Sequence, residues 1–398
     1  MMNNIIVLDT FTIISGIVLL VVAVVSSFFS PFVRFRRRRE EDGGDESEAE
    51  KTPLPPLSVI LTPHDEAGKI EQNLPLILGQ KYPAGFQVIV VVEQGDHETE
   101  DIVKRFRTKL DNEPGDASLY MTYIPESSRY MSRKKLAITL GVKAAKTEWL
   151  VFTEAYSRPA SDRWLLTMAE NCHDYTRLVI GYGCYDEDGV SAFKRFERLY
   201  AASYLMREDT RGTAYTTLSH NVMLRKSDFM QQEGFRGNLE LIRGEYDFLV
   251  NKYAVEDATA LETRSDAWMV DDAPTRKSWM NKHIFYAETR KTLQRSGRHR
   301  AWFNIDQTLL HLSLWLSVAG IAVGAALQNV VLLGAAILSL VISIVMRTVF
   351  GCRALKAFDE SVPVLLVYPY ELSVVWHNAG YLLRHRLADE RDFTTHKE

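Results

Sequence analysis

Long apolar stretches stand at both ends of the chain, and a mixed polar and apolar region lies between them. Ile5 to Phe29 is an almost unbroken apolar run, long enough to cross a hydrocarbon core of roughly 30 Å as one helix. Its positive charges follow it, at Arg34 and from Arg36 to Arg39. A cleaved signal peptide carries its charges first, so the pattern predicts an uncleaved anchor. The positive-inside rule places the residues after it in the cytoplasm.

The C-terminal region contains three further apolar segments. Two of them, 309–327 and 330–346, are separated only by Gln328 and Asn329, which predicts a transmembrane hairpin over about 309–346. Arg347, Arg353 and Lys356 follow this hairpin, again on the inside by the charge rule. The last segment, about 362–383, is interrupted by polar residues. We therefore expect it to be interfacial or re-entrant rather than a further full crossing.

The central region alternates between strand and helix patterns. Apolar runs at 57–62, 86–92, 119–124 and 149–152 predict strands, with helix patterns between them. This alternation predicts a parallel sheet whose strands deliver their polar ends to one edge, where ligands of open α/β sheets bind. The predicted organisation is an anchor (1–33), a basic then acidic linker (34–56), a cytoplasmic α/β domain (57–300) and a C-terminal membrane region (301–398).

Composition narrows the classes of function. The net charge is only −4, so nothing argues for a nucleic-acid partner. The basic segment 268–300 contains interleaved aromatic residues, which we interpret as a membrane-facing helix. Cys172, Cys184 and Cys352 have no metal-ligand spacing and form no disulfide framework, as expected in a reducing compartment. A transporter or channel is disfavoured because most of the chain is an α/β domain.

Polar residues follow three of the predicted strands. Asp65 and Glu66 come after the first strand, Glu93 ends the second, and Glu154 and Tyr156 follow the strand at 149–152. Asp65 is also explained as the N-cap of the next helix, because Asp accepts hydrogen bonds from the free amides at a helix start, and it can serve in both roles at once. Taken alone, the stretch after 149–152 is explained equally well as a ligand site or as a strand end capped by polar loop residues.

The order of these elements resembles the inverting glycosyltransferases of the GT-A fold, of the large "family two" type, over roughly Leu57 to Arg290. More narrowly, it resembles membrane-anchored members from Bacteroidetes-type bacteria. Five places carry the resemblance: His64-Asp65-Glu66; Val91-Val92-Glu93 with Thr99; Ser132 to Gly141; Glu154-Ala155-Tyr156; and Gly234-Phe235 with Gly244-Glu245-Tyr246-Asp247. The resemblance implies a nucleotide-diphospho-sugar transferase fold, with a mixed, mostly parallel sheet, flanking helices and transmembrane helices at both ends.

The resemblance also implies roles for single residues in nucleotide-sugar binding. Asp65, Glu66 and Glu93 would hold the nucleoside, and Lys134 matches the family's lysine near the diphosphate. Glu154 and Tyr156 stand where the family has Asp-x-Asp, whose carboxylates bind a divalent cation such as Mg²⁺ or Mn²⁺. Glu154 remains a metal ligand by type, whereas Tyr156 is a neutral phenol and a poor one, which argues against a metal requirement.

The resemblance places the catalytic base in the last of the five motifs. Inverting transfer needs a carboxylate to take the proton of the acceptor hydroxyl. Glu245 aligns with the family's catalytic Asp, and Asp247 would orient it or replace it. The family's Gln-x-x-Arg-Trp motif is absent near Arg276 and Trp279, which argues against a cellulose-like processive polymerase.

The implied function is transfer of a sugar from a nucleotide-diphosphate sugar to a saccharide or lipid-linked acceptor, with inversion, in cell-envelope or polysaccharide synthesis. The site would face the cytoplasm at a bacterial inner membrane. The alternative is a catalytically impaired relative that binds nucleotide or partner proteins, because Val92, His97 and Tyr156 depart from the family pattern. We favour the enzyme, because Glu93, Glu154 and Glu245 all keep a carboxylate.

Overall fold

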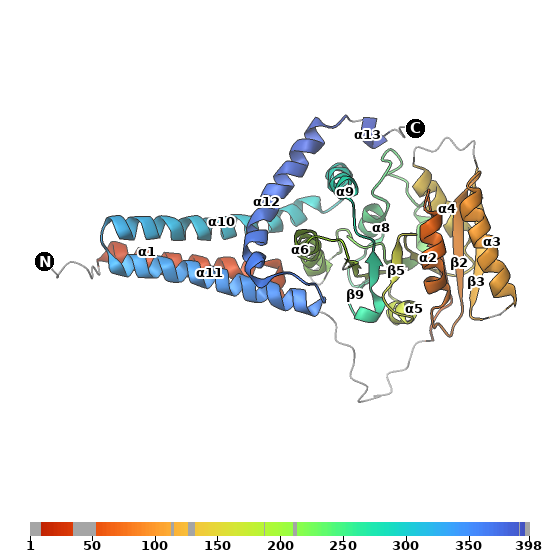
Figure 1. Ribbon diagram of the computed structural model, residues 1–398, viewed down its shortest axis with the longest axis horizontal. Coiled ribbons are helices and arrows are strands. Elements are labelled where there is room, and N and C mark those ends of the chain that lie inside the picture. The colour runs from red at the N-terminus through yellow and green to blue at the C-terminus, as the bar shows by residue number, and fades with distance from the viewer. Residues whose placement is uncertain are drawn as a thin grey trace, which may run out of the picture. The chain divides into compact units, whose positions relative to one another are not determined.

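The computed structural model describes residues 9–34, 53–112, 115–125, 132–186, 188–209, 213–389 and 391–394 (Figure 1). The predicted linker lies almost entirely outside them. The chain forms two compact units: residues 1–36, 191–207 and 297–380 make the first, and residues 37–190, 208–296 and 381–398 make the second. We call them the helical unit and the α/β unit.

The α/β unit is built on a seven-stranded sheet in the order β3-β2-β1-β4-β8-β6-β9. Its strands are β1 (Leu57–Leu61), β2 (Phe86–Glu93), β3 (Ala117–Ile124), β4 (Trp149–Phe152), β6 (Leu178–Gly181), β8 (Val222–Arg225) and β9 (Thr259–Glu262). Only β8 runs antiparallel to its neighbours, β4 and β6; the other pairs are parallel. The predicted mixed, mostly parallel sheet is confirmed.

Helices α2 (Ala67–Leu78), α3 (His97–Asn112) and α4 (Arg133–Ala144) connect the first four strands (Figure 1), as the alternation predicts. The close packing of α4 explains its glycine. A β-carbon at Gly141 would lie 2.6 Å from Cγ2 of Ile60 in β1, so any larger residue would push the helix off the sheet. This contact holds the second half of α4 against β1.

The α/β unit continues with short elements and a second sheet. The helices are α5 (Trp164–Ala169), α7 (Lys226–Gln231), α8 (Glu245–Tyr253), α9 (Arg276–Thr289) and α13 (Arg391–Thr394). The second sheet has the order β5-β10-β7, from β5 (Ser157–Pro159), β10 (Met269–Asp271) and β7 (Gly183–Tyr185).

Residues 178–185 form two short strands, β6 and β7, which lie in different sheets. The side chain of Asn221 lies at the break, where its amide donates to the carbonyls of Tyr182 and Ala267 at 3.2 and 2.7 Å. Gly181 leaves room for that amide, because a β-carbon there would lie 2.1 Å from the Asn221 nitrogen. The Asn221 side chain thus adds hydrogen bonds at the point where the chain passes from one sheet to the other.

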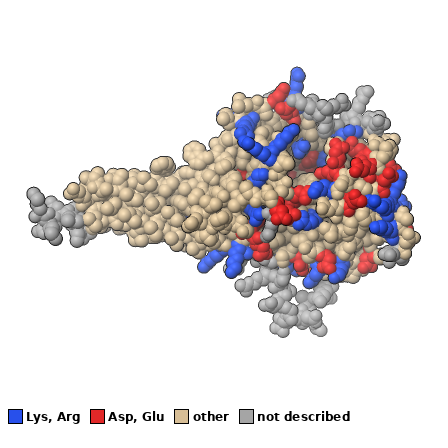
Figure 2. All heavy atoms as spheres, viewed as in Figure 1, with Lys and Arg blue, Asp and Glu red and all other residues tan. Residues whose placement is uncertain are grey.

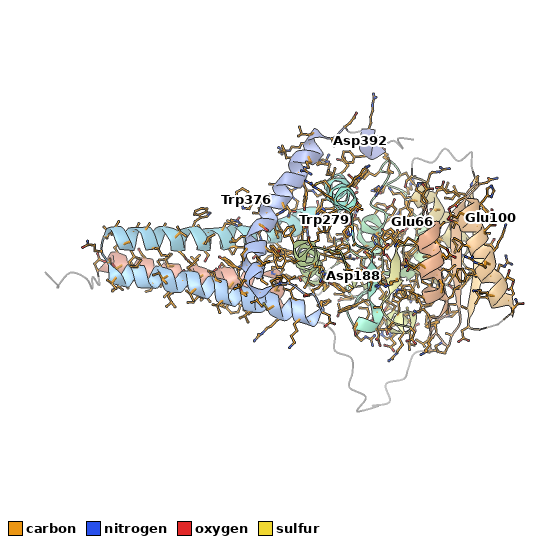
Figure 3. The ribbon with its side chains drawn as sticks, in the orientation of Figure 1. Glu66, Glu100, Asp188, Trp279, Trp376 and Asp392 are labelled. Atoms are coloured by element: carbon orange, nitrogen blue, oxygen red, sulfur yellow. The ribbon has the colours of Figure 1, made fainter. Side chains whose placement is uncertain are left out.

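Helix α9 differs from its sequence-based interpretation as a membrane-facing helix. Trp279, labelled in Figure 3, is buried with Tyr185 and Val190, and its indole nitrogen donates to the Tyr381 hydroxyl at 3.1 Å. The ring of Phe285 lies 5.4 Å from that of Phe393. These aromatic residues therefore pack inside the α/β unit, because a nearby C-terminal segment covers them.

The helical unit contains three helices long and apolar enough to cross a membrane: α1 (Thr10–Phe29), α10 (Ser296–Ala326) and α11 (Val330–Ala357). Their visible faces in Figure 2 carry almost no charged side chains. Small residues bring α1, α10 and α11 together, since a β-carbon at Gly320 would lie 2.9 Å from both Ala336 and Leu19. Helix α12 (Val364–Leu387) is not among the candidate spans of the described chain.

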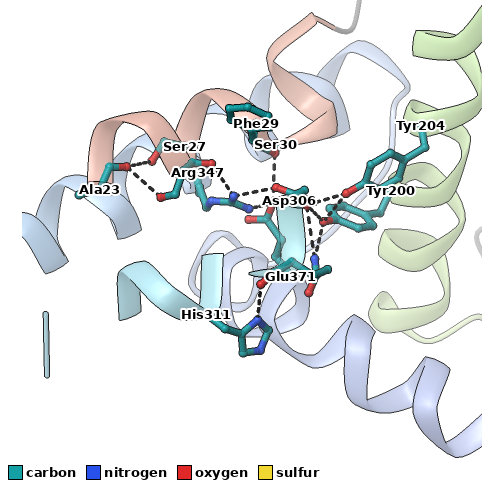
Figure 4. Close-up of polar contacts among 12 residues, drawn as sticks. Ala23, Ser27, Phe29, Ser30, Tyr200, Tyr204, Asp306, His311, Arg347 and Glu371 are labelled. Carbon is teal, nitrogen blue, oxygen red and sulfur yellow. Dashed lines mark hydrogen bonds and ion pairs between the residues drawn. The ribbon is translucent and has the colours of Figure 1, made fainter. Parts of the chain in front are cut away.

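A fully buried group of charges lies within the helical unit (Figure 4). Arg347 of α11 donates to Asp306 of α10 at 2.8 Å and to Glu371 of α12 at 2.6 Å, and all three residues are 0 % exposed. We call these three residues the Arg347 cluster. The charge rule places Arg347 at the flank of the hairpin, but the structure places it inside the helix packing, because two carboxylates compensate it there.

The Arg347 cluster is completed by groups from two more helices. The hydroxyls of Tyr200 and Tyr204, on α6 (Ala192–Asp209), donate to Asp306 at 2.6 Å each. Arg347 also donates to the carbonyl of Ser26 in α1 at 2.6 Å. One guanidinium therefore connects helices that are far apart in the sequence.

Candidate functional site

The carboxyl ends of β1, β2 and β4 meet at one edge of the sheet because the three strands are parallel. Glu154 follows β4, and its side chain is only 5 % exposed. Lys134, in the first turn of α4, donates to the Glu154 carboxylate and, at 3.0 Å, to the carbonyl of Thr62. The Lys134 side chain is 24 % exposed. A buried carboxylate thus holds a partly open cation at this edge.

Glu93, at the end of β2, is also in contact with a histidine and an arginine. Its carboxylate lies 2.9 Å from Nδ1 of His64 and 3.2 Å from the Arg133 guanidinium. An open depression of about 570 Å³ adjoins it, lined by His64, Asp65, Glu93, Gln94, Gly95, Asp96, His97 and Glu98. Arg133 and Lys134 therefore connect the first turn of α4 to two different strand ends.

Asp65 and Glu66 occupy different environments. The side chain of Asp65 is 93 % exposed and its backbone has a positive φ of 54°. Glu66 is the N-cap residue of α2 and makes no capping hydrogen bond, so the helix-cap alternative for Asp65 is wrong. Glu66, labelled in Figure 3, is partly buried. Burial, and next the negative charge of Glu154, raises the pKa of its carboxyl.

Tyr156 faces a histidine rather than a second carboxylate. Its hydroxyl lies 3.4 Å from Nε2 of His220, and Nδ1 of His220 lies 3.4 Å from the carboxylate of Asp271. Asp271 accepts a hydrogen bond of 2.5 Å from Ser157. Burial, and next the charge of Glu154, raises the pKa of Tyr156 well above its usual range, so this phenol is neutral.

Sequence reasoning missed His220. It lies just before β8, whose direction is antiparallel to β4. The amino end of an antiparallel strand lies at the edge where its parallel neighbours have their carboxyl ends. A sequence pattern that predicts an all-parallel sheet therefore looks for site residues only after strands, and a residue before β8 gives no signal.

The residues at this edge do not provide the two carboxylates with which an Asp-x-Asp motif binds a divalent cation. One Glu154 oxygen already accepts from the Lys134 ammonium. Tyr156, at the second ligand position, is a neutral phenol beside His220. Within the described ranges, no group of three or more His, Cys, Asp or Glu residues is arranged to hold a metal ion.

Glu245 and Asp247 lie in the first turn of α8. The preceding Gly244 has a φ of +90°, and a β-carbon there would lie 2.5 Å from the side chain of Thr289. Glycine is therefore required for the turn that presents Glu245. Asp247 accepts a hydrogen bond from Thr216, and burial raises the pKa of Asp247 to about 6.

Lys135 has a structural role that its neighbour Lys134 does not share. It is 1 % exposed, and its ammonium donates to the carbonyl and side chain of Asn238, at 2.6 and 2.7 Å, and to the carbonyl of Leu241. Burial lowers the pKa of Lys135 to about 8. The start of α4 therefore holds the loop that leads to Glu245.

Ile242, in the same loop, is tied at both of its backbone groups. Its carbonyl accepts from the hydroxyl of Ser132, the N-cap residue of α4, at 2.8 Å. Its amide donates to the carbonyl of Phe393 in α13 at 3.0 Å. The loop before Glu245 is thus anchored to α4 on one side and to the C-terminal segment on the other.

The structure joins the predicted residues into neighbouring groups. Lys134 contacts Glu154, and their charges act on Glu66. Glu93 is linked to the exposed Asp65 through His64. Burial, and next the charge of Glu154, raises the pKa of Tyr246, the residue between Glu245 and Asp247, so the start of α8 lies near the same edge. We call Glu66, Lys134, Glu154 and Tyr156 the strand-end site.

Comparison with known proteins identifies the fold. No family model and no curated protein matches the chain. Its structure is similar to that of the mannosyltransferase PcManGT from Pyrobaculum calidifontis in complex with GDP-Man and Mn²⁺, with 15 % identity, a TM-score of 0.50, and coverage of 96 % of this chain and 98 % of that one. The chain has a GT-A-like glycosyltransferase fold. At this identity the similarity shows the fold alone.

Two structures of TarS (residues 1–349) from S. aureus are more distant. One is 14 % identical, with a TM-score of 0.41 and coverage of 81 % of this chain and 91 % of that one. The other, a complex with UDP-GlcNAc, is 13 % identical, with a TM-score of 0.43 and coverage of 81 % and 92 %.

Proposed function

We propose that the chain is a membrane-bound glycosyltransferase that transfers a sugar from a nucleotide-diphosphate sugar to a saccharide or lipid-linked acceptor with inversion. The observation that carries this proposal is the pairing of Lys134 with buried Glu154 at the carboxyl ends of parallel strands. Ligands of α/β sheets bind at this edge, and a cation there suits a diphosphate. PcManGT, which has a similar fold, was solved with a nucleotide-diphosphate sugar, GDP-Man.

The donor would lie across the strand ends. The depression that Asp65 and Glu93 line would hold the nucleoside, and Glu66, the residue after Asp65, would hold it from beside the depression. Arg133 and Lys134 follow one another at the start of α4, so both cations would face the diphosphate. Tyr156, in the turn that follows Glu154, and Tyr246, in the first turn of α8, would border the sugar.

Glu245 would act as the base. The acceptor oxygen forms a bond to the anomeric carbon while the bond from that carbon to the phosphate oxygen breaks. The electron pair of the broken bond stays on the leaving diphosphate, and the acceptor proton goes to the Glu245 carboxylate. Asp247 is the second candidate, because its pKa of about 6 leaves it ionised and basic at neutral pH.

The helical unit supports the proposal of a lipid-linked acceptor. Three helices have the length and composition to cross a membrane, and a soluble acceptor would not require them. With residues after α1 on the inside, the α/β unit would face the cytoplasm of a bacterial inner membrane. Helix α12 would then lie at the membrane interface, with Leu365 at 88 % and Trp376 at 69 % exposure.

A nucleotide-binding protein without transferase activity is the second candidate. The observation that favours it is the contact of Tyr156 with His220, because this pair occupies the place of a metal-ligand carboxylate. In that case the full-length protein in detergent should bind UDP- or GDP-sugars and release no nucleoside diphosphate with any lipid-linked or saccharide acceptor.

The test of the proposal is Glu245→Gln in the full-length protein. Transfer should fall by about 100-fold or more, because the base is lost, while donor binding measured by calorimetry stays unchanged. Glu240→Gln, an exposed position in the same loop, is the matched control and should keep full activity. Retained turnover in Glu245→Gln with loss in Asp247→Asn would move the base to Asp247.

A further inference from the structure

In the Lys134–Glu154 pair, the carboxylate is buried and the lysine side chain is partly exposed. Glu154 is 5 % exposed and Lys134 is 24 % exposed. A lysine ammonium has three N–H groups. Two of them have acceptors among the described residues, the Glu154 carboxylate and the Thr62 carbonyl. The third is left for a ligand on the exposed side.

A divalent cation at Glu154 would compete with this ammonium. It would have to displace Lys134 from a buried carboxylate or lie beside a like charge, and both are unfavourable. Tyr156, at the position of the missing carboxylate, is turned to His220. The arrangement satisfies Glu154 without a metal ion.

A second cation stands beside the first. Arg133 precedes Lys134, and its guanidinium lies 3.2 Å from Glu93 with 39 % of the side chain exposed. Each cation is thus oriented by a carboxylate at a different strand end. Preoriented donors of this kind bind an anion without a further ordering cost.

We propose that Lys134 takes the place of the divalent cation, so that donor binding and transfer need no metal. This inference rests on the proposed function. In the transfer step, the leaving diphosphate gains one negative charge when the bond to the anomeric carbon breaks. The Lys134 ammonium stabilises that charge by a hydrogen bond and keeps its proton. Glu154 acts as a positioning residue, since its carboxylate holds the Lys134 ammonium.

The experiment measures binding of UDP-GlcNAc and GDP-Man to the full-length protein in detergent, first in EDTA and then in Mn²⁺. Affinity for the bound donor should agree within about twofold between the two conditions, because the ammonium supplies the charge. Release of nucleoside diphosphate on addition of acceptor should be equally insensitive to EDTA. An affinity about tenfold or more weaker in EDTA and restored by Mn²⁺ would overturn the inference.

Three variants test the lysine itself. Lys134→Met should weaken donor binding by about tenfold or more in both conditions, whereas Lys134→Arg, which keeps the charge, should retain most of it. Lys143→Met, an exposed lysine on the same helix, is the matched control and should bind like the wild type. Thermal unfolding of each variant separates loss of binding from loss of folding. Wild-type affinity in a folded Lys134→Met variant would overturn the inference.

The outcomes keep this inference separate from the function on which it rests. Strong metal dependence with normal transfer refutes the role of Lys134 and leaves the glycosyltransferase intact. If neither nucleotide sugar binds in either condition, the proposed function fails and this inference fails with it.

Discussion

The Arg347 cluster and the strand-end site both contain a cation paired with a carboxylate, but they differ in exposure to solvent. Arg347, Asp306 and Glu371 are all 0 % exposed, and the groups around them come from the protein. Lys134 keeps 24 % of its side chain exposed above a buried Glu154. A sealed ion pair can only specify how helices pack, whereas a pair open on its cationic side can also bind an anion.

The two places also differ in how far apart in the chain their partners lie. The Arg347 cluster draws on α1, α6, α10, α11 and α12, so its charges are satisfied only when all of these helices are assembled. The strand-end site draws on the ends of strands and helices that one sheet already places side by side. The first group therefore depends on the whole fold of its unit, and the second depends mainly on the local sheet edge.

The largest effect should come from breaking the sealed cluster. Arg347→Met leaves Asp306 and Glu371 as unpaired buried carboxylates, and we expect a loss of about 3–5 kcal/mol of stability. The measurement is the thermal midpoint and the fraction of folded protein in detergent. Arg353→Met, an exposed arginine of the same helix, is the control and should change little.

Variants that also neutralise the two carboxylates test whether unpaired charge causes this loss of stability. Adding Asp306→Asn and Glu371→Gln to Arg347→Met removes both unpaired charges and should recover part of the lost stability. An unchanged midpoint in Arg347→Met would show that the cluster does not hold the helices together.

A smaller, pH-dependent effect is expected at Asp247 in the α/β unit. Its pKa rises from 3.8 to about 6 on folding through burial, so the folded state binds the proton more tightly than the unfolded state. The wild type therefore loses stability as pH rises through this window. Asp247→Asn should gain about 2 kcal/mol relative to wild type between pH 4 and pH 7.

Thermal midpoints of both proteins across that pH range measure this difference. A difference between Asp247→Asn and wild type that is the same at every pH would show that Asp247 is no more protonated in the folded protein than in the unfolded chain.

Glu154→Gln should cost less than Arg347→Met, although Glu154 is buried. The Lys134 ammonium that loses its partner can still reach solvent and the Thr62 carbonyl, so we expect about 1–2 kcal/mol. Glu71→Gln, in the exposed pair with Arg105, is the control and should cost almost nothing. A loss in Glu154→Gln as large as that in Arg347→Met would mean that the strand-end site is sealed too.

The smallest effect should come from removing one tyrosine hydroxyl that donates to the Arg347 cluster. Tyr204→Phe removes one of the two tyrosine hydrogen bonds to Asp306, and we expect about 1 kcal/mol. The thermal midpoint in detergent measures it, with the exposed Tyr120→Phe as control. No difference between the two variants would show that Asp306 is satisfied without Tyr204.

Much of the fold could be predicted from the sequence because its signals are local. The apolar runs of β1, β2 and β4 and the helices between them follow the expected periods, and the three long apolar helices are apparent from composition. The break between β6 and β7 could not be predicted, because it depends on the side chain of Asn221, which comes 40 residues later in the chain than Gly181.

The position of part of the candidate site could also be predicted, because some of its residues lie next to elements with local sequence signals. Lys134 and Glu154 lie next to regular elements, so their placement at a sheet edge follows from the pattern. His220 lies before an antiparallel strand and gives no such signal. In the sequence, Arg347 looks like a charge that flanks the membrane hairpin, because its partner Asp306 is 41 positions away. Partners that meet only in three dimensions leave no local pattern.

The bond between Ile242 and Phe393 ties α13 to the loop that precedes Glu245. The amide of Ile242 donates to the carbonyl of Phe393, and Ile242 comes three residues before the proposed base. A purification tag or reporter fused closely after this segment would pull on the loop. We would therefore engineer this protein with its handle at the opposite terminus.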